Sequence, residues 1–143
     1  MADSKLAFEL VAPERLLASI EADMVVIPGA AGDFGVLPLH APLMSLLRPG
    51  VIAIYQGDRV DQRLFVAGGF AEVNEKGCIV LAEKAEPLEE IQPEAARQAL
   101  RDAEEDLADV KDKPEAERQP FERAVEIARA RVEAVETAPA AAH

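Results

Sequence analysis

The periodicity of apolar residues changes at about Pro87, and this change divides the chain into two parts of different structure. Before Pro87 the sequence consists of short apolar or alternating runs, with turn-forming Gly and Pro about every ten residues. This spacing is typical of an antiparallel sandwich or barrel rather than of βαβ units. After Pro87 the sequence is rich in Ala, Glu, Arg and Leu, and its apolar residues recur with helical spacing. The sequence therefore predicts a β domain followed by helices.

Several runs in the first part are predicted strands. They read LAFELV, MVVIPG, FGVLP, GVIAIYQG, RLFVAGGFAEV and CIVLAE. In the fifth run Gly68 and Gly69 interrupt a strand, which predicts a bulge or a close approach of another backbone. We expect this run to lie in the core of the sheet domain.

Two amphipathic helices are predicted in the second part. Their apolar residues lie alternately four and three positions apart, so each set lines one face of a helix. The sets are Ala96, Leu100, Ala103, Leu107 and Val110, then Phe121, Val125, Ala128, Val132 and Val135. Pro114 and Pro120 predict a break between the helices, which then fold back as an antiparallel hairpin. Pro93 suits the first turn of the first helix, where a missing N–H costs no hydrogen bond.

These patterns predict three parts of the chain. Residues 1–85 are the β-sandwich domain and residues 86–137 the helical hairpin domain. Residues 138–143 lack periodicity and bulk, and we expect a disordered tail. Residues 83–113, around the first helix, carry 11 acidic and 5 basic side chains.

Charge and composition exclude several classes of function. The net charge of -12 would repel a nucleic acid from most of the surface. One cysteine, Cys78, permits no internal disulfide and suits a reducing compartment. The N-terminus resembles neither a signal peptide nor a transit peptide, and we expect the mature chain to start here. The apolar runs are far shorter than the roughly 20 residues that span a bilayer, so we expect membrane association only through a partner.

Two glycine-rich or acidic motifs suggest phosphate or magnesium chemistry but lack the residues that this chemistry needs. The segment PGAAGDFG is followed by no Lys-Ser/Thr pair and does not have the dinucleotide-binding spacing. The triplet Asp33-Phe34-Gly35 matches the magnesium-binding signature of kinases, but the chain has no catalytic-loop His-Arg-Asp. We expect no catalytic site, no metal site and no cofactor.

The two remaining candidates for chemistry have simpler structural roles. His40 and His143 are the two histidines, too few for a histidine metal site, and we expect His40 to shape a turn between Pro38 and Pro42. Catalysis by His40 is the less favoured alternative. Cys78 lies in the apolar run GCIVLA and is predicted to be a small core side chain.

Three blocks of sequence, in order, resemble the epsilon subunit of bacterial F-type (F1Fo) ATP synthase. They are LVAPERLL, GDFGVLPLHAPLMSLLRPGVI and VAGGFAEV. The resemblance runs from about Leu6 to Val135 and implies a flattened antiparallel β-sandwich of about ten strands, followed by a two-helix hairpin. It also implies a non-catalytic rotor subunit of the central stalk. This subunit links gamma to the polar loops of the c-ring and couples proton transport to ATP synthesis at the cytoplasmic face of the inner membrane.

The resemblance further implies which residues contact partners. The segment with Asp33, Phe34, Gly35 and His40 stands where the family contacts the c-ring loops. An exposed acid on a proline-stiffened loop would complement basic residues there. The C-terminal helices imply a second contact, with the alpha and beta subunits.

Some members of the family bind ATP through a motif Ile/Leu-Asp-x-x-Arg-Ala at the start of the first helix. Here the motif is degenerate: it begins at Ile91, with Gln92 in the Asp position and Ala95 in the Arg position, while Arg97 lies two residues later. We therefore expect weak or absent ATP binding. We also expect feeble inhibition of ATP hydrolysis, because acidic residues offset the arginines of the second helix. An ATP-sensing module whose hairpin switches conformation is the alternative function, and a small hydrolase around His40 is a third.

Overall fold

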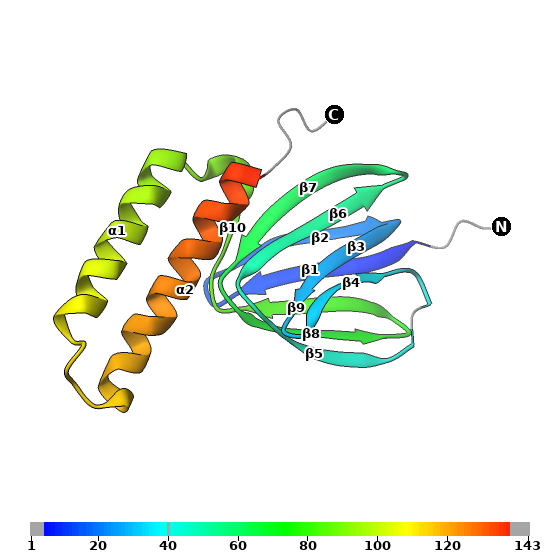
Figure 1. The fold of residues 1–143 in the computed structure, drawn as a ribbon. Helices are drawn as coiled ribbons and strands as arrows, with labels where there is room; N and C mark the ends of the chain where they lie inside the picture. Colours follow the sequence, from blue (N-terminus) through cyan, green and yellow to red (C-terminus); the bar gives the residue numbers. More distant parts are fainter. Residues whose placement is uncertain (1–4, 40, 138–143) are drawn as a thin grey trace.

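The computed structural model describes residues 5–39 and 41–137. In this part of the chain it contains ten strands, one short 3-10 helix and two α-helices (Figure 1). The strands are β1 (Leu6–Ala12), β2 (Arg15–Ala22), β3 (Met24–Gly29), β4 (Gly32–Val36), β5 (Leu43–Leu47), β6 (Gly50–Gln56), β7 (Arg59–Val66), β8 (Gly69–Asn74), β9 (Gly77–Ala82) and β10 (Ala85–Pro87). The helices are η1 (Leu88–Glu90), α1 (Pro93–Asp109) and α2 (Glu115–Thr137).

The strands form one continuous sheet that folds over on itself into two layers. Its order is β10-β7-β6-β3-β5-β8-β9-β1-β2, and β4 pairs with β3 outside this path. The layers join where β3 pairs with β5, through Gly29 and Leu47. The pairs are antiparallel except β1 with β9, which run parallel. The sequence prediction of a sandwich of about ten strands, followed by two helices, is confirmed.

Alternating residues of the strands point between the two layers and form the main core. On β1, for example, Leu6, Phe8 and Leu10 are buried while Ala7 and Glu9 are exposed. Cys78 is buried in the same core, as predicted. Burial raises the pKa of its thiol to about 12, which keeps it protonated and unreactive at neutral pH.

The structure corrects one predicted strand. The run RLFVAGGFAEV is two strands, because β7 ends at Val66 and β8 begins at Gly69. The connection between them takes the chain from one layer to the other. The expected close backbone approach is confirmed, since a Cβ on Gly69 would lie 2.1 Å from the Leu81 carbonyl oxygen. Only glycine fits there.

The hairpin is confirmed, but one of its predicted breaks is wrong. α1 begins at Pro93, as expected, and the turn before α2 contains Pro114. Pro120, however, lies inside α2. Because it is only the sixth residue of the helix, its ring removes one hydrogen bond near the N-terminus, and the longer remainder of the helix stays packed.

α1 and α2 lie side by side at one end of the sandwich (Figure 1). They dock on it through a second apolar cluster, which is separate from the main core. Its buried members are Phe65, Ala67, Leu88, Ile91, Ala96, Val132 and Ala134. Two ion pairs support this contact: Arg123 with Glu83 at 2.6 Å, and Arg131 with Glu86 at 2.8 Å.

The predicted division at residue 85 falls within the last strand, β10, and the domain ranges stay a prediction. The predicted tail, 138–143, lies outside the described residues. None of the helices among the described residues is long and apolar enough to cross a membrane.

Candidate protein-binding surface

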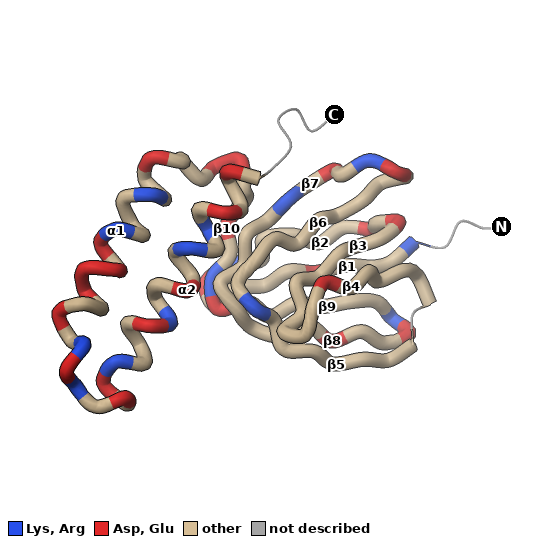
Figure 2. Tube along the Cα trace, in the orientation of Figure 1, with Lys and Arg blue, Asp and Glu red and all other residues tan. Residues whose placement is uncertain are grey.

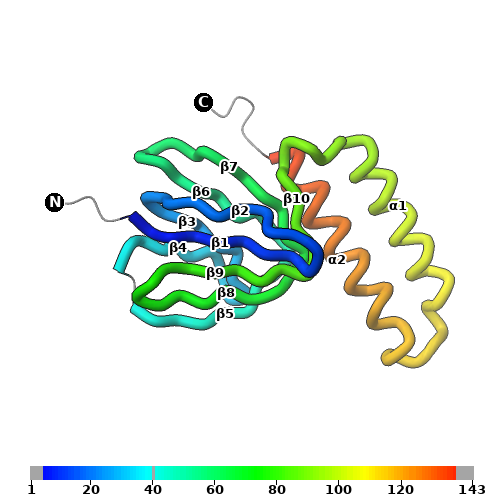
Figure 3. Tube along the Cα trace, turned by 180° about the vertical axis from the view of Figure 1, so that it is seen from behind, coloured from blue at the N-terminus to red at the C-terminus, as the bar shows by residue number. Residues whose placement is uncertain are grey.

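Five apolar side chains form a row across the outer face of one layer. Strand register places Leu46 beside Phe70, Phe70 beside Leu81, Leu81 beside Val11 and Val11 beside Leu16. Residues paired in this way point to the same side of a sheet. The row therefore crosses β5, β8, β9, β1 and β2, which Figure 3 shows in this order from bottom to top.

This apolar row faces away from the core. The neighbours Leu47, Ala71, Ala82 and Leu10 on four of these strands are buried, so the row itself points outward. Leu46 is 70 % exposed, Leu16 58 % and Leu81 39 %. Phe70 and Val11 are half-buried. Contiguous exposed apolar side chains on a folded protein mark a surface that a partner covers.

Sequence reasoning missed the apolar row, because it depends on pairing between strands far apart in the chain. β2 carries Leu16 in register only because of an irregularity between Leu10 and Val11, where the pairing shifts by one residue. No single segment of the sequence displays the pattern.

The structure places Asp33 in a strand, not in the loop that the sequence predicted. It is the second residue of β4 and lies opposite Pro28 of β3. Its carboxylate accepts a hydrogen bond from Arg48 Nη2 at 2.5 Å, and Arg48 Nη1 donates to the Gly29 carbonyl oxygen at 2.5 Å. The acid is exposed but already paired within the chain, a partner that the sequence did not indicate.

The other predicted contact residues differ in exposure. Phe34 is half-buried and packs against the main core, while Gly35 is exposed. His40 lies outside the described residues. The contact role of these four residues stays a prediction.

The degenerate ATP motif lies where the hairpin begins. Ile91 is buried in the hairpin cluster, whereas Gln92 and Ala95 are exposed. Gln92 precedes α1 without a side-chain hydrogen bond to the helix end.

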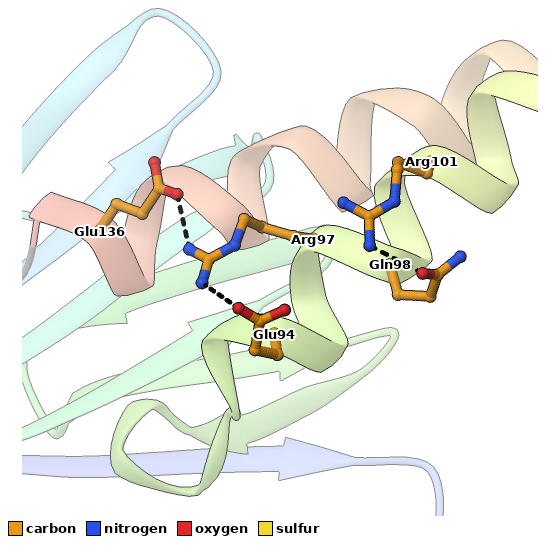
Figure 4. A network of polar contacts seen from close by, with 5 residues as sticks. All are labelled: Glu94, Arg97, Gln98, Arg101 and Glu136. Carbon is orange, nitrogen blue, oxygen red and sulfur yellow. Dashed lines mark hydrogen bonds and ion pairs between the residues drawn. The ribbon is translucent and has the colours of Figure 1, made fainter.

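Two cations follow on α1. Figure 4 shows the guanidinium of Arg97 between two carboxylates, 3.1 Å from Glu94 and 3.0 Å from Glu136, and that of Arg101 donating to Gln98. The two hydrogen bonds to carboxylates raise the pKa of Arg97.

A groove of about 890 Å³ separates the hairpin from the β1–β2 turn and β10. Alanines of both helices line much of its wall. Its charged lining residues are three bases and three acids, namely Arg15, Lys84 and Arg131 with Glu14, Glu83 and Glu86. The balance of three positive and three negative side chains gives no net attraction for a polyphosphate.

The four arginines of α2 are all engaged by carboxylates of the same chain. The pairs are Arg118 with Glu122, Arg123 with Glu83, Arg129 with Glu104, and Arg131 with Glu86. Figure 2 shows acidic residues interspersed with the basic ones along both helices. Within the described residues, no group of three or more His, Cys, Asp or Glu side chains is placed to hold a metal ion.

Comparison with known proteins identifies the family. Residues 5–88 match the model of the ATP synthase delta/epsilon chain, beta-sandwich domain. An ATP synthase epsilon chain of Paramagnetospirillum magneticum is 54 % identical over 107 residues, which cover 75 % of this chain and 80 % of the relative. An ATP synthase epsilon chain of Rhodospirillum rubrum is 56 % identical over 100 residues, or 70 % of this chain and 75 % of the relative.

A chain in the structure of Euglena gracilis mitochondrial ATP synthase, described as OSCP/F1/c-ring, has the same fold. The TM-score is 0.74 at 27 % identity, with 90 % of this chain and 79 % of that chain covered. The resemblance noted in the three sequence blocks is thus confirmed. The chain belongs to the family of ATP synthase delta/epsilon chains.

Proposed function

We propose that this chain is a non-catalytic subunit of the central stalk of an F-type ATP synthase. It binds the gamma subunit and rests on the c-ring, and so couples proton translocation to ATP synthesis. It reaches the cytoplasmic face of the inner membrane only through this complex. The observation that carries the proposal is the apolar row across β5, β8, β9, β1 and β2.

The apolar row suits a stable contact with gamma. Burial of apolar surface contributes about 25 cal/mol per Å², and the exposed leucines of the row offer such surface without a polar group to desolvate. Phe70, at an inner position of the row, adds a large flat side chain of the kind that anchors interfaces. The name of the Euglena structure supports an assembly with F1 and a c-ring for that relative.

A charged substitution in the apolar row tests the proposal. We expect Leu46→Glu to prevent copurification with gamma and to abolish ATP-driven proton pumping in membrane vesicles, because a buried carboxylate would be left unpaired. The matched control is Ala53→Glu, which places the same charge on β6 in the other layer, opposite Arg63. Normal copurification and pumping with Leu46→Glu would show that the row is not the gamma contact.

For the c-ring contact we propose the segment with Asp33, Phe34, Gly35 and His40. Because Arg48 already holds Asp33, a basic residue of a c-ring loop must share or replace this pair. An exposed ion pair contributes about 0.2 to 1 kcal/mol, so the whole surface has to provide specificity.

Charge reversal at this position tests the c-ring contact. Asp33→Lys is expected to reduce coupled proton pumping while the domain stays folded. Asp33→Asn separates the reversal from the simple loss of the Arg48 pair. Unchanged pumping with Asp33→Lys would argue against the contact.

We further propose that the chain uses no cofactor and binds ATP weakly or not at all. Arg97 is held by two carboxylates, and the charges of the nearby groove balance. The alternative function, an ATP-sensing module, requires a cation at this site that is available to phosphate. We also propose that α1 and α2 contact the alpha and beta subunits and that this contact regulates ATP hydrolysis only weakly.

A further inference from the structure

Leu39 has an unusual backbone conformation and an unusual exposure. Its φ is +65°, and it is the one non-glycine residue with positive φ in the part of the chain that the structure describes. Leucine is disfavoured in this left-handed region because its Cβ crowds the backbone, and it lacks the polar side chain with which Asn or Asp compensates. Its side chain is nevertheless 80 % exposed.

The sequence on both sides of Leu39 is apolar and uncharged. From Phe34 to Leu47 the sequence contains no Asp, Glu, Lys or Arg, although 29 % of the chain is charged. The end of β4, the start of β5 and the connection between them carry further exposed apolar side chains. Together with Leu39 we call them the apolar loop: Leu37, Leu39, Leu43 and Met44.

The apolar loop is continuous with the apolar row. Met44 and Leu46 are two residues apart on β5 and therefore point to the same side of the sheet. Met44 is 64 % exposed and lies between the loop and the first member of the row, with Glu72 of β8 paired beside it. A partner that covers Leu46 and extends along β5 meets the apolar loop next.

We infer that Leu39 is an anchor residue for the same gamma subunit, held in its left-handed conformation so that its side chain projects into an apolar pocket of the partner. The inference rests on the proposed function. The unfavourable backbone conformation is not offset by burial of the leucine within the chain. Burial against a partner provides that compensation, and a preset backbone loses less entropy on binding.

The lack of charge decides between the two proposed partners. A loop without charged side chains complements an apolar protein surface better than the polar loops of a c-ring. Asp33 and Arg48, near the other end of β4 and β5, are the charged groups suited to a polar partner. The charged pair of the proposed c-ring contact and the apolar loop thus lie at opposite ends of β4 and β5, while His40 of the c-ring segment directly follows Leu39 in the sequence.

Two substitutions separate the side chain of Leu39 from its backbone conformation. Leu39→Ala removes the anchor but retains the Cβ, so the melting temperature should stay unchanged while affinity for gamma falls about tenfold or more. Leu39→Asn also removes the anchor and suits the left-handed region. It should lose the same affinity, while the melting temperature of the free full-length chain rises by about 2 to 5 °C.

Gly57 provides the matched control. Its φ is +67°, and a Cβ there would meet nothing within 4 Å. It lies in the β6–β7 turn, in the other layer. Gly57→Leu therefore creates an exposed left-handed leucine away from the proposed contact. It should lower the melting temperature by about 2 to 5 °C and leave the affinity for gamma unchanged.

The outcomes distinguish the inference from the proposed function. If the unaltered chain fails to bind gamma, the proposed function is wrong. If it binds but both Leu39 variants bind equally well, the anchor is wrong while the function stands. An unchanged melting temperature in Leu39→Asn would show that the left-handed conformation of Leu39 does not destabilise the free chain. If the Leu39 variants lose binding to the c-ring but not to gamma, Leu39 contacts the c-ring instead. If they lose only self-association in sedimentation, Leu39 contacts a second copy of the chain. Either result would overturn the choice of gamma.

Discussion

Asp23 lies between β2 and β3 and joins three segments of the chain. The β2–β3 connection is at the end of the sandwich away from the hairpin (Figure 1). Its Oδ1 atom lies 2.9 Å from Lys5 Nζ, just before β1. Its Oδ2 atom accepts a hydrogen bond from the Gly57 N–H at 2.5 Å, in the β6–β7 turn. The hydrogen bond from Lys5, followed by that from Gly57, lowers the pKa of Asp23 below its ordinary value of 3.8.

The lowered pKa predicts a pH-dependent contribution to stability. A carboxyl group whose pKa is lower in the folded state stabilises the fold above its unfolded pKa and loses this effect as pH falls through the folded pKa. Asp23→Asn should therefore lower the melting temperature at pH 7, and the difference from the unaltered chain should vanish well below pH 3.8. Thermal unfolding followed by circular dichroism measures this. Asp58→Asn in the same β6–β7 turn changes the net charge equally and is the control.

For single residues, the sequence predicted burial better than it predicted pairing with other side chains. The burial of Cys78 followed from its apolar neighbours, because local hydropathy is visible in one segment. The pairing of Asp33 with Arg48 was not predictable, since the two residues are 15 positions apart and meet only through strand pairing. The conformation of Leu39 was equally hidden, because nothing in its side chain indicates positive φ.

The start of α1 determines whether the hairpin binds a nucleotide. Gln92 offers no carboxylate and Ala95 no cation, while Arg97 is held by Glu94 and Glu136 (Figure 4). Both Gln92 and Ala95 are exposed, so either accepts a larger side chain without disturbing the core.

We therefore expect isothermal titration of the full chain with ATP to give no saturable heat. The double variant Gln92→Asp with Ala95→Arg restores the polar pattern of the family motif and should gain affinity. Micromolar binding by the unaltered chain would contradict the prediction and favour the ATP-sensing alternative. Failure of the double variant to bind would show that the acidic surroundings, rather than the motif, prevent binding.

Elements with clear periodicity were predictable, and irregular ones were not. Apolar residues spaced alternately four and three positions apart predicted both helices. The strands β2, β5 and β10 were not predicted. β2 contains the register irregularity, so it does not alternate cleanly, and β10 is only three residues long. The break predicted at Pro120 was wrong because this proline lies near the start of α2, where its ring removes one hydrogen bond without ending the helix.

The two apolar clusters determine how the hairpin and the sandwich depend on each other. The buried residues of the main core all lie between Leu6 and Ala82, with none from α1 or α2. The hairpin cluster includes Phe65 of β7 and Ala67, which directly follows β7. Moving the hairpin away would expose Phe65 and break the pairs of Arg123 and Arg131, so the described arrangement opposes release.

This arrangement predicts a small regulatory effect of the hairpin. A chain that stops after Pro87 keeps β10 and the main core, and should unfold cooperatively. ATP hydrolysis by the complex should change less than about twofold on truncation, or about 0.4 kcal/mol in activation free energy. The matched variant Phe65→Ser in the truncated chain controls for aggregation through the uncovered side chain. A several-fold increase in hydrolysis would show that the hairpin inhibits strongly.

The separation of the two clusters also has an evolutionary consequence. A substitution within the α1–α2 contact changes no side chain of the main core, so selection acts on the two parts almost independently. During evolution the hairpin can therefore become longer, change its contacts or be lost while the sandwich still assembles with its partners. We expect regulation to diverge quickly among related organisms, and the β4–β5 edge and the outer face of the sheet to change slowly.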